Sequence, residues 1–254
     1  THAKILTKEE VLQLEPHINP SCSGAVHIPG EIVTDPWMFA LALACHARQN
    51  GAKIVTGFEV DSSQLKFNGD VWEINATAKV ECGISKVFAR AVVNAAGLWC
   101  DVIQGDAHER PASWSARPRR GQYRVFQSSR EASLTHPMQP IPTQRTKGIF
   151  VFSTLYDQIV VGPTALDQST RTDRTVDDGV AVEMEEYAKK VLPSINEHDV
   201  VGNYVGIRPG SDKRDYQIKM DSRRQWIACA GIRSTGKIHR RFLSNLTGVC
   251  RTNR

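Results

Sequence analysis

The chain has 254 residues, of which 41% are hydrophobic and 23% are charged, and its formal net charge is +5. This composition is typical of a globular protein with one large domain or two small ones, and no run of about 18 apolar residues predicts a transmembrane segment. Basic residues gather at 110–124 and 223–254 without the sustained basic face and stacking aromatics of a nucleic-acid binder, so we expect no nucleic-acid partner.

The first part of the chain alternates helix and strand signals. A capping-box sequence opens a short helix over 7–14, and a strand is predicted at 25–28. An Asp-Pro pair begins the clearest helix, 35–50, which ends before a glycine. The strand predicted at 53–60 follows so closely that the two suggest part of a βαβ unit. A hairpin is expected over 64–80, where an Asn-Gly pair separates two strand-like segments.

The stretch Ala89–Ile103, ARAVVNAAGLWCDVI, is the most informative part of the sequence. A strand is predicted over 87–94, buried on both faces near its end, followed by a small-residue turn and a helix from Leu98. Small residues at the carboxyl end of a strand let a ligand approach the backbone, and open α/β sheets bind ligands at that edge. The alternative is a tight turn that simply packs on its own sheet.

The second half of the chain is dominated by strands. Its single clear helix, 175–192, carries an apolar stripe and ends at a proline. The predicted strands are 120–126, 148–153, 159–162, 200–207, 216–220 and 225–230. Antiparallel strands with one helix between them fit an α+β domain inserted into the first unit.

The cysteines and the first residues of the chain bear on where the protein is located and on where the chain begins. The six cysteines are widely spaced without a C-x-x-C pair, which argues against a zinc site and a disulfide framework. Reduced thiols favour an intracellular location, cytoplasmic or mitochondrial. The first residues have neither a signal-peptide pattern nor an initiator methionine, so we expect the chain to begin inside a longer protein.

Five segments together resemble one family. VVNAAGLWCDVI is similar to the V-V-N-A-A-G-x-W-x-D stretch of FAD-dependent oxidoreductases of the D-amino-acid oxidase and glycerol-3-phosphate dehydrogenase superfamily. Four further segments resemble the family in the expected order, and these are 24–54, 117–123, 147–167 and 206–236. The likeness covers most of the chain, from about Leu6 to Gly236.

The resemblance implies an α/β (α+β) fold: an FAD/NAD(P)-binding-type domain with an inserted, mostly antiparallel substrate domain. The partial FAD-binding domain would comprise 34–110 and 222–254, and the substrate domain 1–33 and 111–221. The phosphate-binding G-x-G-x-x-G turn of such domains is absent. The resemblance therefore implies that the chain is truncated and that a dinucleotide-binding βαβ unit precedes it. The basic sequence after residue 236 also departs from the family.

The resemblance also implies which residues contact FAD. The matching positions are a strand end, the Ala-Gly turn, a glycine near the flavin and a late loop that closes over the flavin. They are Val60, Ala95, Ala96, Gly97, Trp99, Gly121, Gly231, Ile232, Ser234, Thr235 and Gly236. For Trp99 the alternative is a tryptophan that only fills the core.

Arg208 is the candidate substrate-binding residue. It follows an apolar strand and precedes a proline within GIRP, and arginine binds carboxylate or phosphate in bidentate fashion. The resembled family uses an arginine in a similar stretch for the anionic end of its substrate. The alternative is a structural arginine paired with Asp212 or Asp215. Arg119 and Arg233 are weaker candidates.

The sequence does not select a catalytic base. Oxidation of a hydroxyl carbon needs a group that removes the hydroxyl proton, and histidine is the usual choice. His27, His136 and His198 are plausible, but their spacing does not distinguish them. No metal site is expected. A competing pattern at 231–238, G-x-x-x-x-G-K, falls short of a P-loop because Ile238 replaces the hydroxyl residue.

The resemblance implies a function for the parent protein. It would oxidise a small anionic hydroxy compound, with glycerol 3-phosphate first, and pass electrons through FAD to a quinone or another acceptor. A 2-hydroxy-acid dehydrogenase and an amino-acid oxidase of the same fold are alternatives. A further alternative is a truncated, non-enzymatic fragment that cannot hold FAD.

Overall fold

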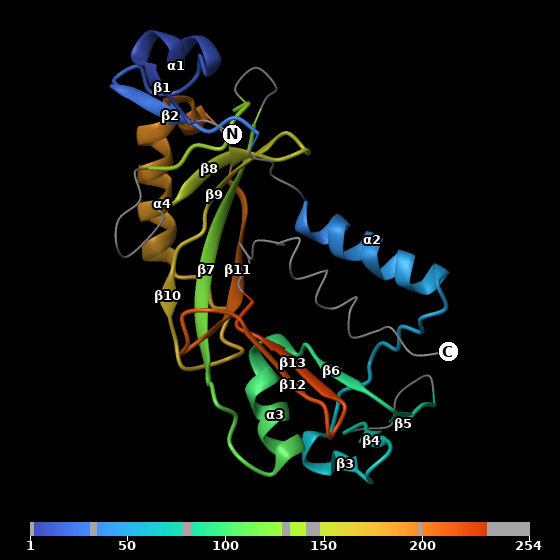
Figure 1. The fold of residues 1–254 in the computed structure, drawn as a ribbon. Helices are drawn as coiled ribbons and strands as arrows, with labels where there is room; N and C mark the ends of the chain where they lie inside the picture. The colour runs from blue at the N-terminus through green and yellow to red at the C-terminus, as the bar shows by residue number, and fades with distance from the viewer. Residues whose placement is uncertain are drawn as a thin grey trace.

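The computed structural model describes residues 3–30, 35–77, 83–128, 133–140, 148–197 and 200–232 (Figure 1). These residues form a mixed α/β fold whose strands belong to four sheets. The elements are, in chain order, β1 (Lys4–Thr7), α1 (Lys8–Leu14), β2 (Gly24–His27), α2 (Pro36–Gln49), η1 (Ser62–Gln64), β3 (Lys66–Phe67), β4 (Trp72–Asn75), β5 (Lys86–Ala89), β6 (Val92–Asn94), η2 (Gly97–Trp99), α3 (Cys100–His108), β7 (Ala116–Gln127), β8 (Phe150–Ser153), β9 (Gln158–Gly162), β10 (Leu166–Asp167), α4 (Asp178–Val191), η4 (Pro193–Glu197), β11 (Val200–Ser211), β12 (Gln217–Asp221) and β13 (Trp226–Ala230).

The largest sheet is antiparallel and has the strand order β10–β7–β9–β8, with β11 also paired to β7. The long strands β7 and β11 run side by side along the molecule, and α4 lies against the sheet (Figure 1). Met184 and Ala188 of α4 join Phe126, Val151 and Ile159 in the main hydrophobic core. The apolar stripe of the predicted helix is thus buried, and the antiparallel arrangement predicted for the strands of this sheet is confirmed.

A smaller sheet, β12–β13–β6, contributes to two further core clusters among the described residues. β13 and β6 are parallel, with Trp226 opposite Val92. Trp72 and Trp226 are fully buried, with ring centroids 4.7 Å apart. The indole N–H of Trp72 donates to the Arg224 carbonyl at 2.6 Å, and that of Trp226 donates to Gln104 Oε1 at 2.7 Å. Because buried donors are costly without partners, these bonds fix how β4, β13 and α3 pack.

Local signals gave several correct predictions. The Thr7 hydroxyl accepts from the Glu10 amide at 3.3 Å, and the Glu10 carboxylate accepts from the Thr7 amide at 2.8 Å, which is the predicted capping box. The predicted strand at 25–28 is β2, shifted by one residue. The predicted hairpin is β3–β4, and the Asn68 side chain accepts from two backbone amides of its turn.

Three strand predictions are wrong. No strand forms over 53–59 among the described residues; only Val60 makes an isolated bridge, to Ala76. A strand needs a neighbour for its backbone groups, and in the described residues a neighbour reaches only the end of this segment, where the Thr77 amide donates to the Glu59 carbonyl at 2.9 Å. The strand predicted over 87–94 is two strands, because β5 and β6 belong to different sheets. Val93 is 56% exposed rather than buried, since β6 is the outer strand of its sheet.

α2 begins as predicted but does not bury its apolar side chains. Asp35 Oδ1 accepts from the Trp37 amide at 2.8 Å and the Met38 amide at 3.1 Å. Yet the helix has no buried residue, and Trp37 and Leu43 are 75% and 56% exposed. An apolar surface of this kind is typical of a site that other polypeptide covers. Even so, no helix of the described residues is both long enough and apolar enough to span a membrane.

Candidate functional site

A small-residue turn follows β6, as the sequence predicts, and Asn94 fixes its shape. Asn94 is buried; its side-chain amide donates to the Cys100 carbonyl at 2.9 Å, and its side-chain oxygen accepts from the Ala96 amide at 3.3 Å. Gly97 has φ +57°, a left-handed conformation that favours glycine. A Cβ added to Gly97 would meet no atom within 4 Å, so the space beside the turn is open.

Other predicted cofactor contacts lie at the same edge of the small sheet. Because β6 and β13 are parallel neighbours, the turn after β6 and the residues after β13 share one end of the sheet. Gly231 is buried there with φ +71°, and Ile232 is 37% exposed. Trp99 is 42% exposed, so the alternative of a core tryptophan is wrong. The structure therefore brings together Ala95, Ala96, Gly97, Trp99, Gly231 and Ile232.

Not every predicted position joins this group. Val60 is half-buried and bridges to Ala76, beside the β3–β4–β5 sheet. Ser234, Thr235 and Gly236 lie outside the described residues, as do Arg233 and the last part of the P-loop-like pattern at 231–238.

Asp101, near the start of α3, connects the small-residue turn after β6 to the large sheet. Its carboxylate accepts from Arg171 Nη1 at 2.7 Å and Nη2 at 3.1 Å, and from the Ala116 amide at 2.8 Å. Arg171 also donates to the Leu98 carbonyl within the turn. Burial alone would raise the pKa of Asp101, but the Arg171 guanidinium and the Ala116 amide outweigh it, so the pKa lies below its usual value.

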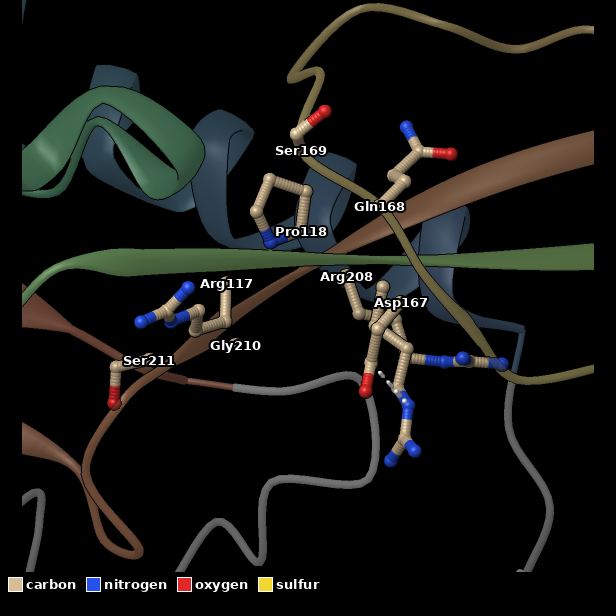
Figure 2. Close-up of a pocket in the computed structure, with 9 residues that line it drawn as sticks. Arg117, Pro118, Asp167, Gln168, Ser169, Arg208, Gly210 and Ser211 are labelled. Atoms are coloured by element: carbon tan, nitrogen blue, oxygen red, sulfur yellow. Dashed lines mark ion pairs between the residues drawn. The ribbon is translucent and has the colours of Figure 1, made fainter.

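The large sheet carries a cleft of about 570 Å³ at the β10 and β11 edges of β7. Figure 2 shows its walls, which are Arg117, Pro118, Arg119, Asp167, Gln168, Ser169, Arg208, Gly210 and Ser211. Arg208 stands directly opposite Arg119, and Arg119 stands directly opposite Asp167. Residues paired in this way point to the same face of the sheet. We call these three residues the charged row.

Arg208 is held in place but not neutralised. Its Nη2 donates to the Thr164 carbonyl at 2.9 Å. Neither Asp212 nor Asp215 pairs with it: Asp212 instead contacts Lys213 at 3.1 Å, and no described carboxylate forms an ion pair with Arg208. The alternative of a structural, paired arginine is therefore wrong for the described part of the chain. A guanidinium of this kind in a cleft is suited to bind an anion.

Gly121 makes room for this arginine. It lies on the same face of β7, two residues beyond Arg119, and a Cβ there would collide with the Arg208 guanidinium and lie 3.2 Å from Pro163 Cβ. The glycine thus leaves space for the Arg208 side chain, a steric role that the sequence did not predict. Both β7 and β11 also contact η2, which places the cleft next to the small-residue turn.

The candidate histidines lie elsewhere. His27 and His136 form an edge-to-face pair with ring centroids 5.4 Å apart, and His136 Nδ1 lies 2.6 Å from the buried Glu15 carboxylate. This pair is near β2, at the opposite end of the large sheet from the small β12–β13–β6 sheet (Figure 1). His198 lies outside the described residues. The described part of the chain contains no group of three or more metal-ligating side chains.

Sequence reasoning missed three residues that shape this site. Asp167, Thr164 and Arg171 are distant in sequence from the residues that they contact. Their roles depend on the register of β10 with β7 and on the contact between α3 and the segment after β10, and no local pattern reveals either.

The family profile described as FAD dependent oxidoreductase matches residues 1–238. The chain belongs to this family. It is 30% identical over 210 residues to the glycerol 3-phosphate oxidase of Mycoplasma pneumoniae, covering 81% of this chain and 52% of that protein. It is 28% identical over 237 residues to the glycerol 3-phosphate dehydrogenase of Caloramator mitchellensis, covering 91% of this chain and 46% of that protein.

Solved structures support the same membership in the FAD dependent oxidoreductase family. The L-alpha-glycerophosphate oxidase of Mycoplasma pneumoniae, solved with FAD bound, superposes with a TM-score of 0.80 at 27% identity, covering 92% of this chain and 60% of that chain. Glycine oxidase from Bacillus cereus, at 22% identity and a TM-score of 0.77, shares the fold. The chain spans about half the length of the curated relatives it matches.

Proposed function

We propose that this chain carries the substrate cleft and part of the FAD site of an oxidoreductase that oxidises a small anionic hydroxy compound, glycerol 3-phosphate first. The observation that carries the proposal is the Arg208 guanidinium, which faces a cleft without an acidic partner among the described residues. The matched proteins named for glycerol 3-phosphate support this substrate. We keep 34–110 with 222–254 as the partial FAD domain, and 1–33 with 111–221 as the substrate domain.

The small residues of the turn after β6 leave room for a flat cofactor. The space beside Gly97 is open, and Ala95, Ala96 and Trp99 are exposed at one edge of the small sheet. FAD, when bound, supplies the acceptor of the two electrons that the substrate loses. In the proposed enzyme the Ala-Gly turn leaves room for the cofactor, and Arg208 orients the anionic end of the substrate beside it. The Asp101–Arg171 pair holds the turn and the cleft wall together.

Two alternative functions are compatible with the same residues. An arginine also binds a carboxylate, so a 2-hydroxy acid or an amino acid would suit Arg208 as well. The exposed apolar face of α2 favours the second class of function, a fragment that acts only when it pairs with another chain.

We infer an intracellular location, cytoplasmic or mitochondrial, and a quinone or another electron acceptor.

A flavin experiment tests the proposal. The purified chain is titrated with FAD, and the flavin absorbance that remains after gel filtration is measured. We expect retained flavin, and we expect anaerobic glycerol 3-phosphate to bleach it faster than lactate or D-alanine. Ala96→Leu places bulk on the turn at an ordinary backbone conformation, with φ −74°, and should abolish retention. A colourless wild-type chain would favour the fragment reading, and faster bleaching by lactate or D-alanine would reassign the substrate.

A further inference from the structure

The charged row brings two guanidinium groups onto neighbouring positions of one sheet face. Arg119 and Arg208 are direct cross-strand partners, so their Cβ atoms are about 5 Å apart. Like charges opposed in this way destabilise a sheet unless something offsets them. Two groups do so here. Arg119 Nε lies 2.8 Å from Asp167 Oδ1, and Arg208 donates to the Thr164 carbonyl.

The two groups that offset the repulsion between Arg119 and Arg208 differ in charge and in how firmly they are held. The Thr164 carbonyl is neutral and fixed, because the Thr164 amide donates to the Gln122 carbonyl at 3.1 Å and its hydroxyl accepts from the Gln122 amide at 2.9 Å. Asp167 carries a full negative charge on a two-residue edge strand, and its side chain is 73% exposed. An exposed ion pair is weak, so this carboxylate holds Arg119 loosely.

We propose that Asp167 is a specificity-determining residue of the cleft, because it acts as an internal counter-ion that occupies Arg119 and leaves Arg208 as the principal anion-binding group. The inference rests on the proposed function, since it assumes that Arg208 receives the substrate's anion. With Asp167 ionised, the charged row has a net charge of +1. Without that charge, the row has a net charge of +2 and can bind two anionic oxygens or a doubly charged group.

The electrostatic consequence depends on the ligand's charge. When Asp167 no longer occupies Arg119, the Arg119 guanidinium can face the ligand. The attraction that it adds is proportional to the charge of the ligand, so a dianion should gain about twice the free energy that a monoanion gains. We expect Asp167→Asn to tighten binding of glycerol 3-phosphate, a dianion at pH 8, by about 10-fold and of lactate by about 3-fold. Because the groups are exposed, both gains should shrink as salt is added.

A matched control exists on the opposite face of the same strand. Arg120 follows Arg119 in β7 and therefore points the other way, and it pairs with Asp173 at 3.5 Å. Asp173→Asn removes the same charge from a second arginine–aspartate pair without changing the charged row. Arg119→Gln supplies the second control, because an effect of Asp167 that acts through Arg119 should largely vanish in the double variant.

The test is isothermal titration calorimetry of the 254-residue chain with glycerol 3-phosphate and with lactate at pH 8. The proposal is supported if Asp167→Asn tightens binding of the dianion more than binding of the monoanion. This effect should be absent in Asp173→Asn and reduced in the Arg119→Gln background. Unchanged affinities, equal tightening for both ligands, or a full effect without Arg119 would overturn it. If Arg208→Ala weakens binding while Asp167→Asn changes nothing, only this inference fails. If neither ligand binds any variant, the proposed function fails and this inference fails with it.

Discussion

Asp101→Asn is expected to lower the free energy of unfolding by about 3 kcal/mol, the typical cost of removing one partner of a buried ion pair. The Asp101 side chain is 9% exposed, and its two oxygens accept three hydrogen bonds from Arg171 and Ala116. An asparagine replaces one oxygen by an N–H₂ group that cannot accept. One of the donors then loses its partner, and Arg171 keeps an uncompensated charge.

This loss should depend on pH. Because the pKa of Asp101 is lower in the folded chain than its ordinary value of 3.8, its stabilising contribution is fully present above about pH 4 and is lost as the pH falls through the folded value. Urea unfolding of wild type and variant at pH 7 and pH 3 measures it. Asp173→Asn, whose carboxylate is exposed, is the matched control and should change little. Equal stability of wild type and Asp101→Asn at pH 7 would contradict the buried-pair account.

Gly121→Ala should weaken anion binding without a comparable loss of stability. The new Cβ would occupy the position of the Arg208 guanidinium, which ends a flexible side chain and can move away. Moving it breaks the bond to Thr164 and takes the charge out of the cleft. We expect affinity for glycerol 3-phosphate to fall by about 30-fold or more, since a lost charge-assisted hydrogen bond typically costs about 2–3 kcal/mol.

The matched control for this substitution is the cross-strand glycine. Gly206 pairs with Gly121 in the register of β7 and β11, yet a Cβ there would meet no atom within 4 Å. Gly206→Ala should therefore leave both affinity and thermal stability close to those of wild type. If the two alanine variants bind glycerol 3-phosphate alike, the steric role assigned to Gly121 is refuted.

Local chemistry could be predicted from the sequence. The capping box at Thr7 and the Asp35 cap depend on residues two or three positions apart, so the pattern itself contains both partners. The same is true of the turn at Ala96 and Gly97, where small residues follow a short strand and the glycine adopts a left-handed conformation. Arg208 was found in the same way, through the GIRP pattern. The predicted strand end before it is wrong, because β11 continues to Ser211 and its pairing with β7 holds Arg208 inside the strand.

Long-range register could not be predicted. Asp101 and Arg171 are 70 positions apart, and Asp167 meets Arg119 only because a two-residue strand pairs with β7. The sequence also suggested a strand over 53–60, yet strands depend on neighbours, and among the described residues only Val60 of this segment makes a bridge, to Ala76. The sequence thus predicted the candidate arginine of the cleft, but it did not predict the residues that set its environment.

The central claim, that the cleft binds its ligand through Arg208, is tested most directly by the affinity of the chain for glycerol 3-phosphate. Calorimetry should show Arg208→Ala weakening binding by about 30- to 150-fold, from the loss of about 2–3 kcal/mol. Arg208→Lys should recover only part of this, because lysine keeps the charge but loses the two-pronged geometry. Dissociation constants equal to that of wild type in both variants would contradict the account and make Arg208 a structural residue.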